Sequence, residues 1–241
     1  MPVAQLKKEE KEFFDQVKDG SYDVFTEGSY RRLLKFFDHL IIEERDQVML
    51  DLGCGSGAFS RFLKELRIPM IGIDLSFNLI AAAKKKIGEV NFLVADAEYL
   101  PLAEKSVDLV VFSGFLHHLP DLHRVTKEAY RVLKDEGRCF AYDPNCDNPL
   151  MWLYRNKRSP FYSNKGITPN ERLLKAKEIR EAFSQAGFKV SVFAISGLSY
   201  KYIKDRKMAL FLPLYNTIEK FFGLMPFSNR YGSFLITLAR K

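Results

Sequence analysis

A glycine-rich turn carries the clearest chemical signal in the sequence. Gly53, Gly55 and Gly57 follow an apolar run at 47–52 and precede a helical pattern. Glycine has no Cβ and accepts positive φ angles, so the backbone of such a turn can approach a ligand closely. The helix behind the turn offers unpaired N–H groups at its N-terminus. Asp51, at the end of the apolar run, can hold a positively charged group. The sequence therefore predicts a nucleotide-type cofactor site.

Two cofactors fit the turn. Gly53, Gly55 and Ala58 match the G-x-G-x-x-[GA] fingerprint of dinucleotide-binding proteins. Asp74 lies about 20 residues beyond the turn, where that fingerprint places an acidic residue on a ribose hydroxyl. The glycine turn alone thus leaves a nicotinamide dinucleotide open as a cofactor.

Read as D-x-G-x-G-x-G, residues 51–57 resemble the first motif of class I S-adenosylmethionine-dependent methyltransferases. That family also places a residue equivalent to Asp74 on ribose, so later segments must distinguish the two cofactors. The apolar run that ends at Asp96 is similar to the family's adenine site, and residues 106–121 are similar to its fourth strand and following loop. The resemblance covers about residues 45–145. It favours S-adenosylmethionine, with S-adenosylhomocysteine as product, and the type 11 methyltransferases that act on small molecules or lipids.

The resemblance implies which residues bind this cofactor. Asp51 would support its ammonium group, directly or through water, and Asp74 would accept from both ribose hydroxyls. Asp96 would accept from the adenine amino group, while Ser113 and Phe115 would line the methyl-donor end. The expected cofactor-binding residues are Asp51, Gly53, Cys54, Gly55, Gly57, Asp74, Leu75, Asp96, Ala97, Ser113 and Phe115.

Two adjacent histidines follow the predicted fourth strand. His117 or His118 can act as the general base that an alcohol or amine acceptor needs, because imidazole titrates near neutral pH. The alternative is that one of them packs under the loop and bonds the backbone. Asp143 is a further candidate. The cysteines lack metal-ligand spacing, and no metal is expected.

The elements that must position these residues alternate between strands and helices. Nearly continuous apolar runs predict strands covered on both faces, at 47–52, 69–73, 90–95, 107–112 and 138–142. Helical patterns fall between them at 58–66, 77–87 and 122–133. Such alternation predicts a parallel sheet with right-handed crossovers and ligands at the carboxyl ends of its strands.

Later segments complete the predicted α/β fold. Thr168, Pro169 and Glu171 form a capping-box pattern that predicts a helix at 169–186. Runs at 188–194 and 233–239 supply two more strands, and the resemblance implies that the last is antiparallel. The expected fold is a Rossmann-like, seven-stranded, mostly parallel sheet with helices on both faces.

We expect a single methyltransferase domain over residues 1–241, with four parts. They are a helical N-terminal lid at 1–44, a cofactor-binding core at 45–145, and substrate-side insertions at 146–170 and 197–232 that form a cap. The candidate substrate contacts are Tyr22, Phe25, Asn145 and Trp152. Tyr22 and Phe25 fit equally well as packing anchors of the helical layer. The apolar insertions fit a cap core, a greasy pocket or a membrane-docking surface.

Composition narrows the class of protein. The chain has 241 residues, of which 47% are hydrophobic, and a net charge of +7. It has no apolar run of membrane-spanning length, and its first ten residues lack the apolar core of a signal peptide, so a cytoplasmic location is expected, with peripheral membrane contact left open. The predicted function is methyl transfer to a small-molecule or lipid-linked acceptor. An RNA methyltransferase, favoured by the basic balance, and a non-catalytic cofactor-binding partner protein are the alternatives.

Overall fold

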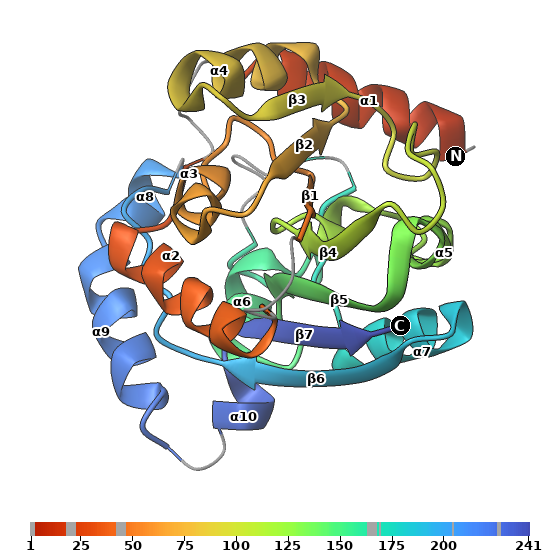
Figure 1. Cartoon of the computed structure of the whole chain (residues 1–241). Helices are drawn as coiled ribbons and strands as arrows, with labels where there is room; N and C mark the ends of the chain where they lie inside the picture. The colour runs from red at the N-terminus through yellow and green to blue at the C-terminus, as the bar shows by residue number, and fades with distance from the viewer. Residues whose placement is uncertain are drawn as a thin grey trace.

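One twisted sheet organises the part of the chain that the structure describes (Figure 1). The structure is a computed structural model and describes residues 3–17, 23–41, 47–162, 168, 170–203, 205–225 and 228–241. Within these ranges seven strands lie in the order β3-β2-β1-β4-β5-β7-β6. The strands are β1 (Met49–Leu52), β2 (Met70–Asp74), β3 (Asn91–Val94), β4 (Val107–Phe112), β5 (Leu133–Pro144), β6 (Lys189–Ile195) and β7 (Phe234–Arg240). Parallel pairs join β3, β2, β1, β4 and β5, whereas β7 runs antiparallel to both β5 and β6. The predicted fold class is confirmed.

Helices cover both faces of this sheet. They are α1 (Val3–Asp15), α2 (Glu27–Leu34), α3 (Ser60–Leu63), α4 (Phe77–Ile87), α5 (His123–Val132), α6 (Pro149–Arg155), α7 (Ala176–Ala186), α8 (Arg206–Ala209), α9 (Leu212–Phe222) and α10 (Ser228–Tyr231). Successive strand residues point to opposite faces, so each strand feeds two cores. Leu50 packs with the apolar side chains of α5 and α7, while Met49 packs with those of α2 and α3. The sheet is therefore buried on both sides, as its continuous apolar runs predict.

The predicted start of the helix at 169–186 is wrong, whereas its predicted end is confirmed. In the structure α7 begins at Ala176, and its C-terminus is closed by Gly187 at φ 107°. Leu174 instead forms a β-bridge with Asn145. Thr168 keeps one contact of the expected capping box, because its backbone N–H donates to the Glu171 carboxylate at 3.4 Å. The segment from Thr168 to Leu174, as far as it is described, runs beside the end of β5 and toward the site.

The second insertion places its longest helix, α9, at the outer edge of the molecule, with α8 above it in Figure 1. Glu219 of α9 is fully buried and accepts hydrogen bonds from the Ser233 hydroxyl at 2.6 Å and the Gly197 N–H at 3.3 Å. These contacts fix α9 to the residues that border β6 and β7. Among the described residues, no helix has the length and apolar character needed to cross a membrane.

Candidate cofactor and catalytic site

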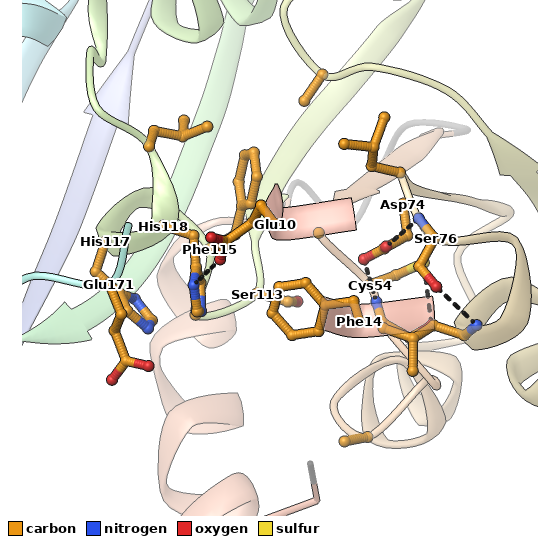
Figure 2. Close-up of a pocket in the computed structure, with 18 of the residues that line it drawn as sticks. Glu10, Phe14, Cys54, Asp74, Ser76, Ser113, Phe115, His117, His118 and Glu171 are labelled. Atoms are coloured by element: carbon orange, nitrogen blue, oxygen red, sulfur yellow. Dashed lines mark hydrogen bonds and ion pairs between the residues drawn. The ribbon is translucent and has the colours of Figure 1, made fainter. Parts of the chain in front are cut away.

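A cavity of about 260 Å³ lies at the carboxyl ends of the parallel strands. Its walls come from the loops that follow β1, β2, β3 and β4, from the end of β5, and from α1, which crosses above them. Figure 2 shows the two groups of polar side chains that face it. Asp74, Ser76 and Cys54 lie at one end, while His117, His118, Glu10 and Glu171 lie at the other.

The glycine turn is held against Asp74. Gly53 has φ 66° and Gly55 has φ 53°, in the left-handed region that favours glycine. The Gly55 N–H donates to Asp74 Oδ2 at 2.9 Å, and the Ser76 N–H donates to Asp74 Oδ1 at 2.9 Å. Burial raises the pKa of Asp74, although these two donors oppose the shift. Each carboxylate oxygen retains a lone pair for a further donor from the cavity.

Asp51 lies behind the cavity wall. Its carboxylate accepts from the Ser60 hydroxyl at 2.6 Å and from the Ser113 hydroxyl at 2.5 Å, and its side chain is fully buried. Burial raises the pKa of Asp51 to about 6. Ser113 lines the cavity, whereas Asp51 is not among the described residues that line it. Asp51 can therefore act on a ligand through the Ser113 hydroxyl.

Helix α1 is fixed over the cavity by charged contacts. The Lys7 ammonium lies 2.7 Å from Asp96 Oδ2 and 2.7 Å from Glu98 Oε2. Glu10 Oε1 lies 2.8 Å from His118 Nδ1. The Phe14 ring contacts the His118 ring edge to face at 5.3 Å. The N-terminal segment therefore lies over the cavity and contacts both of its ends.

The histidine pair has two different environments. His117 Nδ1 lies 2.8 Å from Asp143 Oδ1, and the His117 backbone N–H donates to the same oxygen at 3.0 Å. Burial and the neighbouring His118 lower the pKa of His117 well below its usual value, while burial raises the pKa of Asp143 to about 8. Burial also lowers the pKa of His118, but the Glu10 hydrogen bond and the charges of Glu171 and Asp143 outweigh it, and that pKa is raised.

Residues outside the predicted cofactor and histidine motifs complete this end of the cavity. Thr168 Oγ1 lies 3.0 Å from His118 Nδ1. Arg155 of the first insertion pairs with Glu171 at 2.7 Å, and both side chains line the cavity. Burial raises the pKa of Glu171, but Arg155 and the two histidines outweigh that effect and lower it. Arg155 and Glu171 therefore favour each other's charged form.

The acceptor-rich cavity fits S-adenosylmethionine. Its polar wall contains the carboxylates of Asp74, Asp96 and Glu10. Glu10 Oε2 is buried and has no hydrogen-bond partner within the described part of the chain. S-adenosylmethionine carries a sulfonium, an ammonium group, two ribose hydroxyls and an adenine amino group, all of which such oxygens can attract or accept from.

The structure brings most of the predicted site residues to one cavity. The predicted residues that line it are Gly53, Cys54, Gly55, Asp74, Leu75, Asp96, Ala97, Ser113, Phe115, His117, His118 and Phe25. Those missed by the sequence include Lys7, Glu10 and Tyr200. The resemblance implied that the N-terminal segment is a lid, but nothing in its sequence indicated which side chains reach the site.

Other predicted residues lie elsewhere, and Tyr22 lies outside the described residues. Gly57 is absent from the described cavity lining, and a Cβ there would stand 2.2 Å from Ile87 Cδ1, so this glycine permits packing of α4. Asn145 is fully buried, and its amide donates to the carbonyls of Arg230 and Gly232 at 3.0 and 2.7 Å. Asn145 was expected to contact the substrate, but in the structure it connects the end of β5 to the second insertion.

Trp152 also lies away from the cavity. It belongs to α6, its side chain is 38% exposed, and it is absent from the cavity lining within the described ranges. The neighbouring Met151 is buried instead and packs in the core shared with α2 and α3. On a helix, adjacent positions point in different directions, and the apolar cluster of this insertion could not show which one turns inward.

Comparison with known proteins shows the family of the chain. Residues 50–141 match the family described as a methyltransferase domain. A demethylmenaquinone methyltransferase from Lactobacillus johnsonii is 34% identical over 187 residues, which cover 68% of this chain and 75% of that protein. A malonyl-[acyl-carrier protein] O-methyltransferase from Geobacter sulfurreducens is 32% identical over 189 residues, covering 74% of this chain and 70% of that protein. In three further proteins with these two names, the matched region covers 34% to 65% of the other protein's length.

The fold agrees with solved structures as well. A SAM-dependent methyltransferase from Archaeoglobus fulgidus has a TM-score of 0.63 with 22% identity, and the match covers 89% of this chain and 94% of that one. The chain therefore belongs to the class I S-adenosylmethionine-dependent methyltransferases. Its methyl donor is S-adenosylmethionine.

The link between α1 and the histidines gives a first prediction. We expect Glu10→Gln to lower the pKa of His118, because the carboxylate that bonds its Nδ1 and favours the imidazolium is replaced by a neutral amide. NMR titration of the histidine ring nitrogens measures the shift. Glu12→Gln, an exposed change on the same helix, is the matched control and leaves the His118 pKa in place. A His118 pKa that is the same in the Glu10 variant and the wild type would show that α1 does not reach the site in solution.

Proposed function

We propose that this methyltransferase, as a single domain, methylates a small acceptor with a substantial apolar portion, and that His117 removes the acceptor's proton. The observation that carries this proposal is the aromatic wall beyond the donor end of the cavity. Phe25, Tyr142, Tyr200 and Phe234 line it. The Phe25 ring lies 5.0 Å from that of Tyr200 and 5.2 Å from that of Phe234. A wall of this kind binds apolar or ring-shaped groups and offers few partners to a phosphate backbone.

The names of two relatives support the same class of acceptor. They refer to demethylmenaquinone and to a malonyl group on an acyl-carrier protein. Neither name refers to a nucleic acid. We extend to this chain only the shared feature, which is a compact reactive group with an apolar or carrier-bound remainder.

The cofactor-binding residues act by position and charge. Asp74 would accept from the ribose hydroxyls while it holds the Gly55 N–H, and Asp96 would accept from the adenine amino group. Lys7 already donates to Asp96 Oδ2, so the adenine amino group and the Lys7 ammonium would share or exchange this carboxylate as an acceptor. Ser113, oriented by Asp51, would present its oxygen lone pairs to the methionine end. When bound, S-adenosylmethionine supplies an electrophilic methyl group that is transferred by in-line displacement.

His117 is the better-placed base of the two histidines. Its lowered pKa keeps it neutral, and Asp143 can fix its tautomer by accepting from Nδ1–H. The Nε2 lone pair is then available to take a proton from the acceptor. The hydrogen bond to Glu10 raises the pKa of His118 and favours its imidazolium form, which cannot accept a proton.

This assignment predicts a pH dependence. Asp143, with a pKa raised to about 8, holds a proton at lower pH, and its O–H then donates to His117 Nδ1 and leaves the imidazole proton on Nε2. Loss of the Asp143 proton creates the base form. We expect kcat to rise about tenfold per pH unit up to about pH 8 and then to level off. Asp143→Asn should abolish this rise of kcat with pH. If kcat of the variant still rises in the same pH range, another group is responsible for the rise.

A panel of purified acceptors tests the proposed acceptor class. Demethylmenaquinone, malonyl-loaded acyl-carrier protein and a structured RNA are each incubated with labelled S-adenosylmethionine and the protein. Transfer to one of the first two supports the proposed acceptor class, while transfer to the RNA alone overturns it. Only demethylmenaquinone also tests the base, because the malonyl carboxylate is already ionised near neutral pH and has no proton for His117 to remove. Asp96→Ala serves as the control for transfer that does not depend on the cofactor site.

A further inference from the structure

Helix α9 exposes a continuous apolar face. Leu210, Phe211, Leu214, Ile218, Phe221, Leu224 and Met225, here called the α9 apolar face, are 39% to 81% exposed. Leu214, Ile218 and Phe221 follow one another at steps of four and three residues, which places them along one side of the helix, and Phe211 and Met225 flank its two ends. Single exposed apolar residues are ordinary on a protein surface, but a contiguous stripe of this size marks a contact surface.

The opposite side of α9 is fixed to the cavity wall. Asn216 Oδ1 accepts from the Tyr200 N–H at 3.0 Å, and Asn216 Nδ2 donates to the Tyr200 carbonyl at 2.8 Å. The rings of Tyr200 and Tyr215 lie 5.8 Å apart. Since Glu219 is also buried and hydrogen-bonded, α9 cannot rotate to bury its apolar face without breaking these contacts. The helix therefore joins the outer surface to Tyr200, which lines the cavity.

The exposed charged side chains that the structure describes within this insertion have one sign. Arg206, Lys220 and Arg230 are exposed. The acidic residues described in this insertion, Asp205 and Glu219, are buried. An apolar stripe bordered by exposed basic side chains complements an anionic lipid surface, because the basic groups contact headgroups while the apolar ones enter the acyl boundary. A dimer formed through two copies of this surface is disfavoured, because it would bring basic side chains of the two copies together.

We propose that the α9 apolar face docks on an anionic membrane, from which the acceptor's apolar portion reaches the cavity beside Tyr200. This inference rests on the proposed function, because it supplies the source of an apolar acceptor. With 11 residues α9 is too short to span a bilayer, and it would lie in the plane of the interface.

Vesicle co-sedimentation of the full chain tests the proposal without any acceptor. We expect binding to vesicles of phosphatidylcholine with phosphatidylglycerol, weaker binding to phosphatidylcholine alone, and loss of binding at high salt. Leu214→Gln/Phe221→Gln should weaken binding at least tenfold, because two large apolar side chains would leave the acyl boundary. Leu93→Gln is the matched control, since Leu93 is 41% exposed on β3 at the opposite edge of the sheet and its loss should change nothing.

Three outcomes would overturn the membrane proposal. They are no binding to anionic vesicles, equal weakening by both variants, and a concentration-dependent dimer that the double variant dissociates while vesicles have no effect. Circular dichroism confirms that each variant is folded. Failure here is distinct from failure of the proposed function: methylation of an apolar acceptor in detergent without vesicle binding would refute only the membrane surface. Vesicle binding with no transfer to any apolar acceptor would refute only the proposed acceptor.

Discussion

Replacing Asp74 by alanine is expected to weaken binding of S-adenosylhomocysteine at least a hundredfold. The carboxylate holds the Gly55 and Ser76 N–H groups at 2.9 Å each and faces the cavity. Its loss would release the glycine turn and remove the acceptor proposed for the ribose hydroxyls. A hydrogen bond to a charged group contributes about 1.5–3 kcal/mol, so two of them exceed the hundredfold threshold. Isothermal titration calorimetry measures the change.

Two variants make the Asp74 result specific. Asp74→Asn keeps one acceptor oxygen, and we expect it to bind with intermediate affinity. Asp121→Ala removes an exposed carboxylate whose role is to accept from the His123 N–H, and it should leave affinity unchanged. Wild-type affinity in Asp74→Ala would mean that this carboxylate does not hold the cofactor.

Replacing His117 by alanine is expected to lower kcat by about 10²–10⁴-fold, the usual contribution of a general base. The affinity for S-adenosylhomocysteine should stay within about twofold, because His117 makes none of the proposed cofactor contacts. Single-turnover methyl transfer measures the chemical step, and calorimetry measures binding.

His118→Ala separates a base from a positioning residue. Its ring lies 4.1 Å from that of His117, between centroids, but its Nδ1 faces Glu10 and Thr168. We expect a smaller loss of kcat than in His117→Ala, together with loss of the contact between α1 and the loop after β4. Equal losses in the two variants, or a larger loss in His118→Ala, would move the base assignment to His118.

Sequence patterns predicted the sheet because its strands are buried on both faces. A strand such as β4 must be apolar at nearly every position, and this gives a run that a single sequence reveals. The helix at 77–87 was predicted with its observed bounds, since Ser76 caps its start and Gly88 ends it. The start of α7 was not predictable, because a capping pattern is local, whereas the hydrogen bonds of Leu174 and Glu171 are made with distant segments.

The cofactor end of the site was predictable for a similar reason. Its residues follow directly on strand ends, so topology alone brings Gly53, Asp74 and Asp96 together. The contacts made by Lys7 and Glu10 span 89 and 108 positions in sequence. No spacing rule connects residues that far apart. Asp51 shows a third limit, because a motif position cannot show whether its side chain faces the ligand or supports the side chain that does.

The central claim is that this chain methylates an apolar small molecule with S-adenosylmethionine. Its most direct test is transfer of labelled methyl from S-adenosylmethionine into a fractionated extract of the cells that produce the protein, with Asp74→Ala alongside the wild type. We predict label in the organic-soluble fraction, or on a carrier protein, with the wild type and none with the variant. Label confined to RNA or to the aqueous small molecules, and dependent on Asp74, would contradict the proposed acceptor while it preserved the enzyme class.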